Sequence, residues 1–277
     1  MIIVCWNIKA FGAHALQSPR KWTLLQTIFS QADVVFILEG PKAAATSNQA
    51  ANRLGNQMGG QWQAASIHTP APGNENEYVI YAWDGHYING VVPNVVYAQQ
   101  AAGHRPPVAF TINGILHQAG GVGNVNVLVW HAPPIDQNPG QLWTGLRSQL
   151  NNNANYDLLM GDFNSTPTAP LGYTDVPQQA LNGGTMIHDP RTHRITEPDE
   201  GVGGSANDRI FIRNGFVYGA AYLCGVKNPL EAIVGEDILS PVPGTGRAKR
   251  KRPSIDLMDG HQIAWETSNH APMYVVV

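Results

Sequence analysis

The sequence is poor in charged residues and in cysteine. Asp, Glu, Lys and Arg make up 13% of its 277 residues, about half of the roughly 25% found in typical soluble domains. Its two cysteines, Cys5 and Cys224, are too few for a disulfide framework or a zinc site built from thiolates. The formal net charge of −3 argues against a protein that coats nucleic acid with its whole surface, and leaves open a local basic patch.

Long hydrophobic runs are absent as well. No apolar run reaches the roughly 18 residues needed to cross a bilayer, so we expect neither a membrane-spanning segment nor a membrane partner. The first seven residues lack the basic stretch and the longer apolar stretch of a cleaved signal peptide. We therefore expect a protein that is cytoplasmic in the cell that makes it, or that is secreted by a route without a cleaved leader.

Apolar residues, glycine and proline are plentiful. Hydrophobic residues account for 43% of the chain, and there are 29 glycines and 20 prolines. This composition predicts one domain over residues 1–277 with a sizeable core and many short elements joined by turns. Short apolar runs bounded by turn residues predict buried strands. The predicted strands are Ile2–Trp6, Val34–Leu38, Tyr78–Trp83, Val108–Ile112, Val125–Trp130, Leu158–Met160, Arg209–Ile212 and Met273–Val277.

Three helices are predicted, all in the first 151 residues. The first begins at Ser18 as N-cap, with Pro19 at the first helical position, and apolar residues at helical spacing follow. The others are residues 43–58 and 141–151. Helices gathered early, with hairpin-like runs in much of the remainder, favour two sheets packed face to face with helices outside over a doubly wound fold. Residues 182–207 and 227–258 are predicted to be irregular.

Polar residues stand at the ends of these strands. Because the carboxyl ends of some strands and the amino ends of antiparallel neighbours meet at one edge of a sheet, we expect such side chains to converge. Any one of them could simply belong to a polar loop; six together weaken that explanation. If the backbone stays extended at Asp162, the side chain of Asn164 points the same way. The six are Asn7, Glu39, His131 and Asp162, which follow strands, and Asp208 and His270, which precede them.

The segments that carry these residues stand in a characteristic order. Together they resemble the signature of the endonuclease/exonuclease/phosphatase superfamily, the group of pancreatic deoxyribonuclease and the nuclease subunit of cytolethal distending toxin. The opening Asn7–Gly12 is similar to the deoxyribonuclease branch in particular. The segments are Trp6–Lys9, Ile37–Glu39, Trp130–Pro134, Gly161–Asn164, Asn207–Ile210 and Ser268–Pro272.

The resemblance implies a fold: an α/β four-layer sandwich of two mixed, largely antiparallel sheets packed face to face, with helices outside. It also implies metal-dependent hydrolysis of phosphodiesters. It implies that Glu39, helped by Asn7, holds a divalent cation, and that His131 and His270 act as general acid and base. Asp162 and Asn164 would position the attacking water, and Asp208 would orient His270. Arg105 would contact the phosphate, although it could equally be a surface arginine. Glu77, with Glu75 as the alternative, is predicted to pair with His131.

The chemistry of these residue types agrees with such a reaction. Oxygen donors without thiolates favour Mg²⁺ or Mn²⁺, with Ca²⁺ as a structural alternative, over Zn²⁺. A histidine beside a carboxylate has its imidazolium stabilised, which suits proton transfer near neutral pH. The sequence departs from the family at Asn269, where the family normally carries Asp among its metal ligands. The lost negative charge should lower metal affinity.

Three functions follow as hypotheses. The first is a divalent-metal-dependent nuclease that cuts DNA with little sequence specificity. The second is a phosphodiesterase or phosphatase acting on phospholipids or phosphoinositides, and the third is a non-catalytic binding module of the same fold. The basic run Arg247–Arg252 could be a solvated loop, a grip on DNA or a nuclear-import signal. If the protein is a toxin or effector delivered to another cell, its producer needs a cognate inhibitor or immunity protein.

Overall fold

The structure is a computed structural model of the whole chain, and it describes fourteen stretches of it. These are residues 1–8, 11–12, 15–70, 77–95, 105–116, 122–134, 138–152, 155–165, 167–176, 186–187, 202–203, 207–223, 267–268 and 270–277. The stretch 227–258, predicted to be an irregular insertion that contains the basic run, lies outside the described residues, as do Cys224 and Asn269. The interpretations of the basic run and of the single domain therefore stay predictions.

The described strands form two six-stranded sheets and one short pair. The first sheet has the order β13 (Ala220–Leu223), β14 (Met273–Val276), β1 (Ile2–Asn7), β2 (Val34–Gly40), β4 (Glu77–Asp84) and β3 (Trp62–Thr69). The second has the order β5 (Gly90–Val95), β6 (Val108–Leu116), β7 (Val122–His131), β8 (Leu158–Asp162), β12 (Asp208–Arg213) and β9 (Tyr173–Asp175). A separate pair joins β10 (Met186–Ile187) to β11 (Val202–Gly203).

The sheets are mixed and largely antiparallel. The pairs β1–β2 and β7–β8 run parallel, and every other described pair runs antiparallel. The pair β10–β11 falls inside residues 182–207, so the prediction of an irregular stretch is wrong for those four residues. Each of its strands is only two residues long and is stabilised by its partner, which leaves no periodic signal in the sequence.

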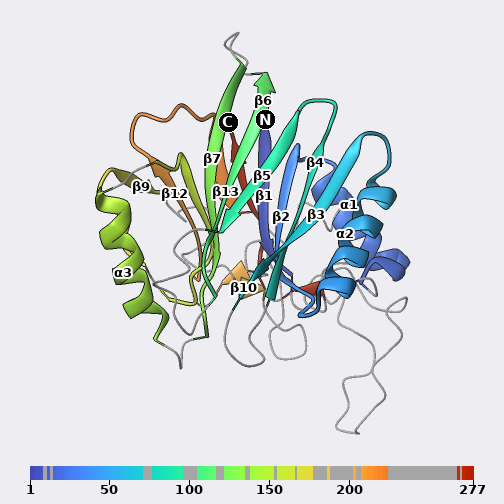
Figure 1. The fold of residues 1–277 in the computed structure, drawn as a ribbon, viewed down its shortest axis with the longest axis horizontal. Helices are drawn as coiled ribbons and strands as arrows, with labels where there is room; N and C mark the ends of the chain where they lie inside the picture. Colours follow the sequence, from blue (N-terminus) through green and yellow to red (C-terminus); the bar gives the residue numbers. More distant parts are fainter. Residues whose placement is uncertain are drawn as a thin grey trace, which may run out of the picture.

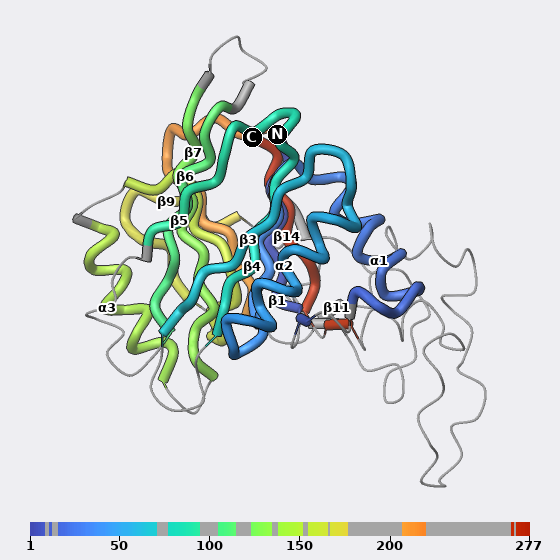
Figure 2. The backbone as a smooth tube through the Cα atoms, turned by 45° about the vertical axis from the view of Figure 1, so that its right-hand side comes forward, coloured from blue at the N-terminus to red at the C-terminus, as the bar shows by residue number. Residues whose placement is uncertain are grey.

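In the part of the chain that the structure describes, three α-helices cover the outer faces of the sheets. They are α1 (Pro19–Phe29), which follows the short 3₁₀ helix η1 (Ala15–Gln17), α2 (Ala44–Met58) and α3 (Pro139–Asn152). The predicted cap of α1 is confirmed, since Ser18 accepts a hydrogen bond from Lys21 N–H and Pro19 opens the helix. Figures 1 and 2 show α1 and α2 on one side of the pair of sheets and α3 on the other.

The buried apolar residues form three separate clusters, which correspond to the three interfaces of a four-layer sandwich. One cluster, with Phe36 and Phe110 in ring contact, lies between the two sheets. A second joins the first sheet to α1 and α2 through residues such as Trp6, and the third joins the second sheet to α3 through Trp143. The predicted four-layer α/β sandwich is therefore confirmed.

The chain termini and the polar ends of the strands lie at opposite edges of the sandwich. Met1 N–H₃⁺ donates to Val277 C=O at 2.6 Å, and both termini lie at the upper edge in Figure 1. From there β1 runs down to Asn7, while β14 enters at the opposite end, since Met273 pairs with Cys5. The polar ends of the strands therefore gather at the edge of the sandwich far from the termini. Among the described residues, no helix has the length and apolar character needed to cross a membrane.

Candidate active site

The register of the strands brings the predicted polar residues together at one edge. In the second sheet Asp162 pairs with His131 of the parallel strand β7 and with Asp208 of the antiparallel strand β12. In the first sheet Asn7 ends β1 beside β2, which carries Glu39. Because the two sheets pack face to face, the ends of β1 and β8 meet, and Asn7 Nδ2 donates to Asp162 Oδ2 at 2.8 Å. The convergence expected from the sequence is thus present in the structure.

His270 lies between two carboxylates. Its Nδ1–H donates to Asp208 Oδ2 at 2.9 Å, and its Nε2 lies 3.5 Å from Asp162 Oδ2. Burial by itself would lower the pKa of this imidazole, but the charge and hydrogen bond of Asp208, and then the charges of Asp162 and Glu39, raise it from 6.5 to about 9. At neutral pH His270 therefore carries a proton on both ring nitrogens.

His131 has a different environment because it shares its carboxylate with an arginine. Its Nδ1–H donates to Glu77 Oε1 at 2.8 Å, and the guanidinium of Arg105 pairs with the same carboxylate and lies 2.6 Å from Nδ1. Burial and Arg105 act to lower the pKa of His131, but Glu77 outweighs them and the pKa lies above its usual value. Burial would raise the pKa of Glu77, but the two cationic neighbours hold it below its usual value.

Glu39 and Asn164 occupy strained positions of the backbone. Both have positive φ, 57° and 45°, a region that costs a side-chain-bearing residue roughly 1–3 kcal/mol and that clusters at functional sites. Glu39 lies where the register between β2 and β4 shifts, a bulge that redirects its side chain. The expected extended backbone from Asp162 to Asn164 is absent. The Asp162 carboxylate instead accepts the Asn164 N–H at 2.8 Å, and the Asn164 side chain donates to the Ala132 carbonyl.

The oxygen atoms around Asn7 fit a divalent cation. Asn7 is 1% exposed, and its amide oxygen, Oδ1, has no hydrogen-bond partner among the described residues. A buried amide oxygen without a donor is costly, and a cation would satisfy it. The amide nitrogen of the same side chain lies 3.5 Å from Glu39 Oε1, whose side chain is 33% exposed. An oxygen-only donor set of this kind suits Mg²⁺ or Mn²⁺.

A second group of potential ligands lies next to the first. One ligand atom each of Asp162, Asp208 and His270 falls within 4.8 Å of the other two. His270, however, directs both ring nitrogens at carboxylates, and an ion bound at Nε2 would have to displace its proton. The described residues therefore offer two adjacent candidate metal positions, the oxygen atoms of Glu39 and Asn7 and the group of Asp162, Asp208 and His270.

The structure does not establish the roles predicted for Arg105 and Asn269. The guanidinium of Arg105 is only 13% exposed and pairs with Glu77 beside His131, so its contact with phosphate stays a prediction. Asn269 lies outside the described residues. Glu77 is the partner of His131, as predicted. The sequence reasoning missed the link between Arg105 and Glu77, and it assigned no role to Trp6 or Ser268, whose hydrogen bonds to His270 have no signature in composition or spacing.

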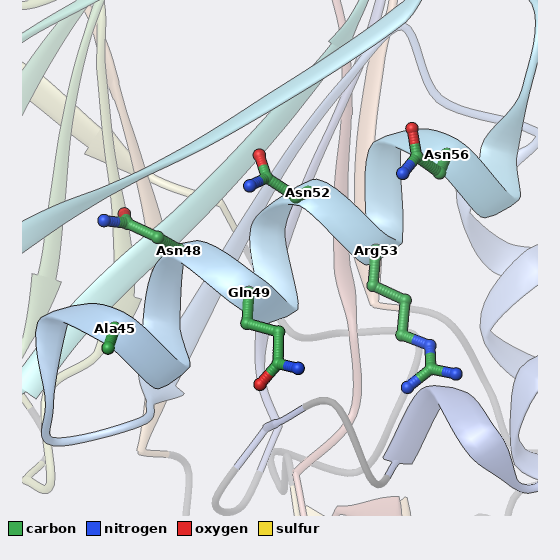
Figure 3. Close-up of a pocket in the computed structure, with 6 residues that line it drawn as sticks. All are labelled: Ala45, Asn48, Gln49, Asn52, Arg53 and Asn56. Atoms are coloured by element: carbon green, nitrogen blue, oxygen red, sulfur yellow. The ribbon is translucent and has the colours of Figure 1, made fainter.

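Two other features of the fold are separate from this chemistry. Figure 3 shows a shallow hollow on the exposed face of α2, and its lining offers no carboxylate or imidazole. The buried thiol of Cys5 has its pKa raised by burial and by the charges of Asp208 and Asp162, which keeps it protonated and inert. The hollow is lined by Ala45, Asn48, Gln49, Asn52, Arg53 and Asn56.

No protein-family model and no curated protein matches the sequence, but solved structures share its fold. The TDP2 protein of D. rerio, in complex with a single-stranded DNA product, has a TM-score of 0.57 at 13% identity. The match covers 99% of this chain and 97% of the TDP2 chain. An endonuclease/exonuclease/phosphatase family protein from Leptotrichia buccalis has a TM-score of 0.55 at 15% identity, with coverages of 99% and 98%. A mannosyl-6-phosphatase from Bacteroides thetaiotaomicron has a TM-score of 0.54 at 12% identity, also with 99% and 98%.

Proposed function

We propose that this chain, which has the fold of the endonuclease/exonuclease/phosphatase superfamily, is a divalent-metal-dependent hydrolase that cuts DNA phosphodiester bonds. The observation that carries the proposal is the pair of buried histidine–carboxylate contacts that flank Asp162. The Nε2 atoms of His131 and His270 lie 3.7 Å and 3.5 Å from the same oxygen, Asp162 Oδ2. Two imidazoles, a carboxylate and a neighbouring set of oxygen ligands are the groups that phosphodiester hydrolysis needs.

The roles of the residues follow from their surroundings. Glu39 and Asn7 would hold the cation, which when bound would offset charge on the phosphate oxygens. His270 is protonated at neutral pH, so it supplies the proton to the leaving oxygen as the phosphorus–oxygen bond breaks. Asp162 accepts a proton from the attacking water, whose oxygen forms the new bond to phosphorus. This transfer leaves the overall proton count unchanged.

We assign His131 a role in binding the phosphate of the substrate. Glu77 fixes the imidazole through Nδ1 and leaves Nε2 directed toward Asp162. With Arg105 beside it, His131 forms a cationic corner that attracts a phosphate anion. The substrate contact of Arg105, expected from the resemblance, would extend from this corner.

Among the described residues, three of the exposed apolar side chains, Tyr87, Val217 and Tyr218, lie away from the candidate site. Tyr87 lies in the turn after β4, and Val217 and Tyr218 follow β12. Both strands begin at the polar edge, with Glu77 and Asp208, and end away from it. An enzyme that meets a bilayer with its active site would need such side chains around the site itself.

The proposal is tested by plasmid nicking with Mg²⁺, with Mn²⁺ and with EDTA. His131→Ala and His270→Ala are compared with His86→Ala, which alters an exposed histidine in the turn after β4. We expect metal-dependent nicking in the wild type and in His86→Ala, and its loss in the other two variants. Cleavage of phosphoinositides or of a phosphomonoester without nicking would favour the phosphatase alternative. Metal-dependent DNA binding without hydrolysis would favour the non-catalytic module.

We also propose that the nuclease is an effector that its producer must neutralise with an inhibitor protein. The support is the resemblance to toxin nucleases and the basic run Arg247–Arg252. Expression of the wild type alone in a bacterial cytosol should slow growth and degrade chromosomal DNA, while His270→Ala should be tolerated. Normal growth with the active wild-type enzyme present would refute the need for an inhibitor.

A further inference from the structure

The backbone of His270 is held on both sides by buried side chains. Its N–H donates to the hydroxyl of Ser268 at 2.9 Å, and its C=O accepts the indole N–H of Trp6 at 2.6 Å. The Ser268 hydroxyl in turn donates to the backbone C=O of Asn7. Trp6 and Ser268 are each 1% exposed. We call Trp6, Ser268 and the Asn7 carbonyl the His270 clamp.

The clamp connects the backbone of His270 to the carboxylate that its imidazole faces. The same Asn7 that accepts from Ser268 donates from its side chain to Asp162 Oδ2 at 2.8 Å. The imidazole of His270 ends 3.5 Å from that Asp162 oxygen. A closed path therefore runs from Ser268 through Asn7 and Asp162 to His270 and back through the backbone.

We propose that Ser268, together with Trp6, is a positioning residue that sets the placement of the His270 imidazole for phosphodiester cleavage. This inference rests on the proposed function. Ser47 of α2 is also fully buried, but its hydroxyl has no partner among the described residues. Ser268 differs because both of its hydrogen bonds go to residues of the candidate site.

The test compares Ser268→Ala and Trp6→Phe with Ser47→Ala. Each of the first two changes removes one hydrogen bond to the backbone of His270, and phenylalanine keeps an aromatic ring for the edge contact with Phe29. Ser47→Ala removes a buried hydroxyl that makes no hydrogen bond to His270 or to the clamp among the described residues. Rates are measured on plasmid DNA over a range of DNA concentrations at saturating Mg²⁺.

We expect kcat of Ser268→Ala to fall by about 100-fold, the size of effect that a displacement of about 1 Å can cause. KM should stay within about threefold, because the histidine acts in the transition state. Trp6→Phe should lower kcat in the same way, and the double variant should lose less than the product of the two single losses, since both act through one backbone. Ser268→Thr, which keeps the hydroxyl, should recover part of kcat, and Ser47→Ala should match the wild type.

Three outcomes would overturn the inference. One is a Ser268→Ala rate that higher Mg²⁺ restores, because the serine would then act on the metal. Another is multiplicative loss in the double variant. The last is an unchanged NMR signal of the His270 Nδ1 proton in folded Ser268→Ala, with Ser47→Ala as reference. The NMR comparison needs no activity, so absence of cleavage by the wild type refutes the proposed function while the clamp is still tested.

Discussion

Gly161 is the residue whose replacement should harm the site most without touching a functional group. It lies in β8 directly before Asp162 and opposite Trp130, the residue before His131. Its φ is 147°, and a Cβ added there would lie 1.9 Å from the carbonyl oxygen and 2.8 Å from the carbonyl carbon of Trp130. The absence of a side chain therefore permits the approach of β7 and β8 that brings His131 beside Asp162.

The cost of Gly161→Ala has two parts. Carbon–oxygen contacts between strands are ordinarily about 3.3 Å or longer, so the carbonyl of Trp130 would have to move by more than about 1 Å. That movement breaks ladder hydrogen bonds worth about 1 kcal/mol each, including the one from Ala132 N–H to Asp162 C=O at 2.8 Å. The backbone conformation adds roughly 1–3 kcal/mol. We expect a loss of about 4 kcal/mol in the free energy of unfolding.

Two other glycine variants help to separate the cost of the backbone conformation from the cost of the contact with Trp130. Gly59→Ala tests the conformational cost alone, because Gly59 has φ 70° and ψ −168°, a region that only glycine adopts readily, and open space around its Cβ position; it should lose about 1–3 kcal/mol. Gly145→Ala, inside α3 with open space, should gain about 0.5–1 kcal/mol from helix propensity.

Urea unfolding followed by tryptophan fluorescence gives all three values, and plasmid nicking gives the activity of the variants that fold. If Gly161→Ala loses no more than Gly59→Ala, the backbone contact with Trp130 is not what brings the two strands together. If it unfolds as expected but the folded fraction keeps full activity, the approach of the strands matters for stability alone.

Three further predictions concern charge. The first is measured in EDTA. Because the pKa of His270 is raised, its contribution to stability is complete below pH 6.5 and is lost as the pH rises through about 9. The free energy of unfolding should fall by up to about 3 kcal/mol over that range, and His270→Gln should abolish that part of the pH dependence. Glu77→Gln leaves the guanidinium of Arg105 and the imidazole of His131 without their shared carboxylate; urea unfolding should show a loss of about 2–3 kcal/mol, and NMR titration should show a lower pKa for His131. Asn269→Asp restores a negative charge at the position where the family carries one, so nicking should reach half its maximal rate at a lower Mg²⁺ concentration, and an unchanged Mg²⁺ dependence would contradict the predicted ligand.

The inner strands were predictable from the sequence because burial on both faces makes them continuous apolar runs. Apart from the short pair β10–β11, four described strands were not predicted: β3, β5, β9 and β13, and each lies at the edge of a sheet. An edge strand has one neighbour and a partly exposed face, so its sequence carries a weaker signal. Pro93 in β5 would even argue against a strand, although an edge strand tolerates it.

The position of Glu39 shows a different limit of sequence reasoning. Its place after an apolar run and before Gly40 predicted a functional residue, but the positive φ of 57° and the bulge in β2 were not readable. A Cβ on Gly40 would lie 2.4 Å from the Tyr78 carbonyl oxygen, so glycine is required for β2 to approach β4 this closely. The bulge therefore depends on a contact with a strand 38 residues later, which no local pattern records.

The two histidines also look alike in the sequence, since each was expected to stand beside a carboxylate. The structure makes them unequal through one residue. Arg105 shares Glu77 with His131, so the negative charge that would stabilise the imidazolium of His131 is divided between two cations. His270 instead faces two carboxylates, Asp208 and Asp162. The difference in surroundings between the two histidines therefore comes from the placement of Arg105, a residue 26 positions before His131 whose partner the sequence did not reveal.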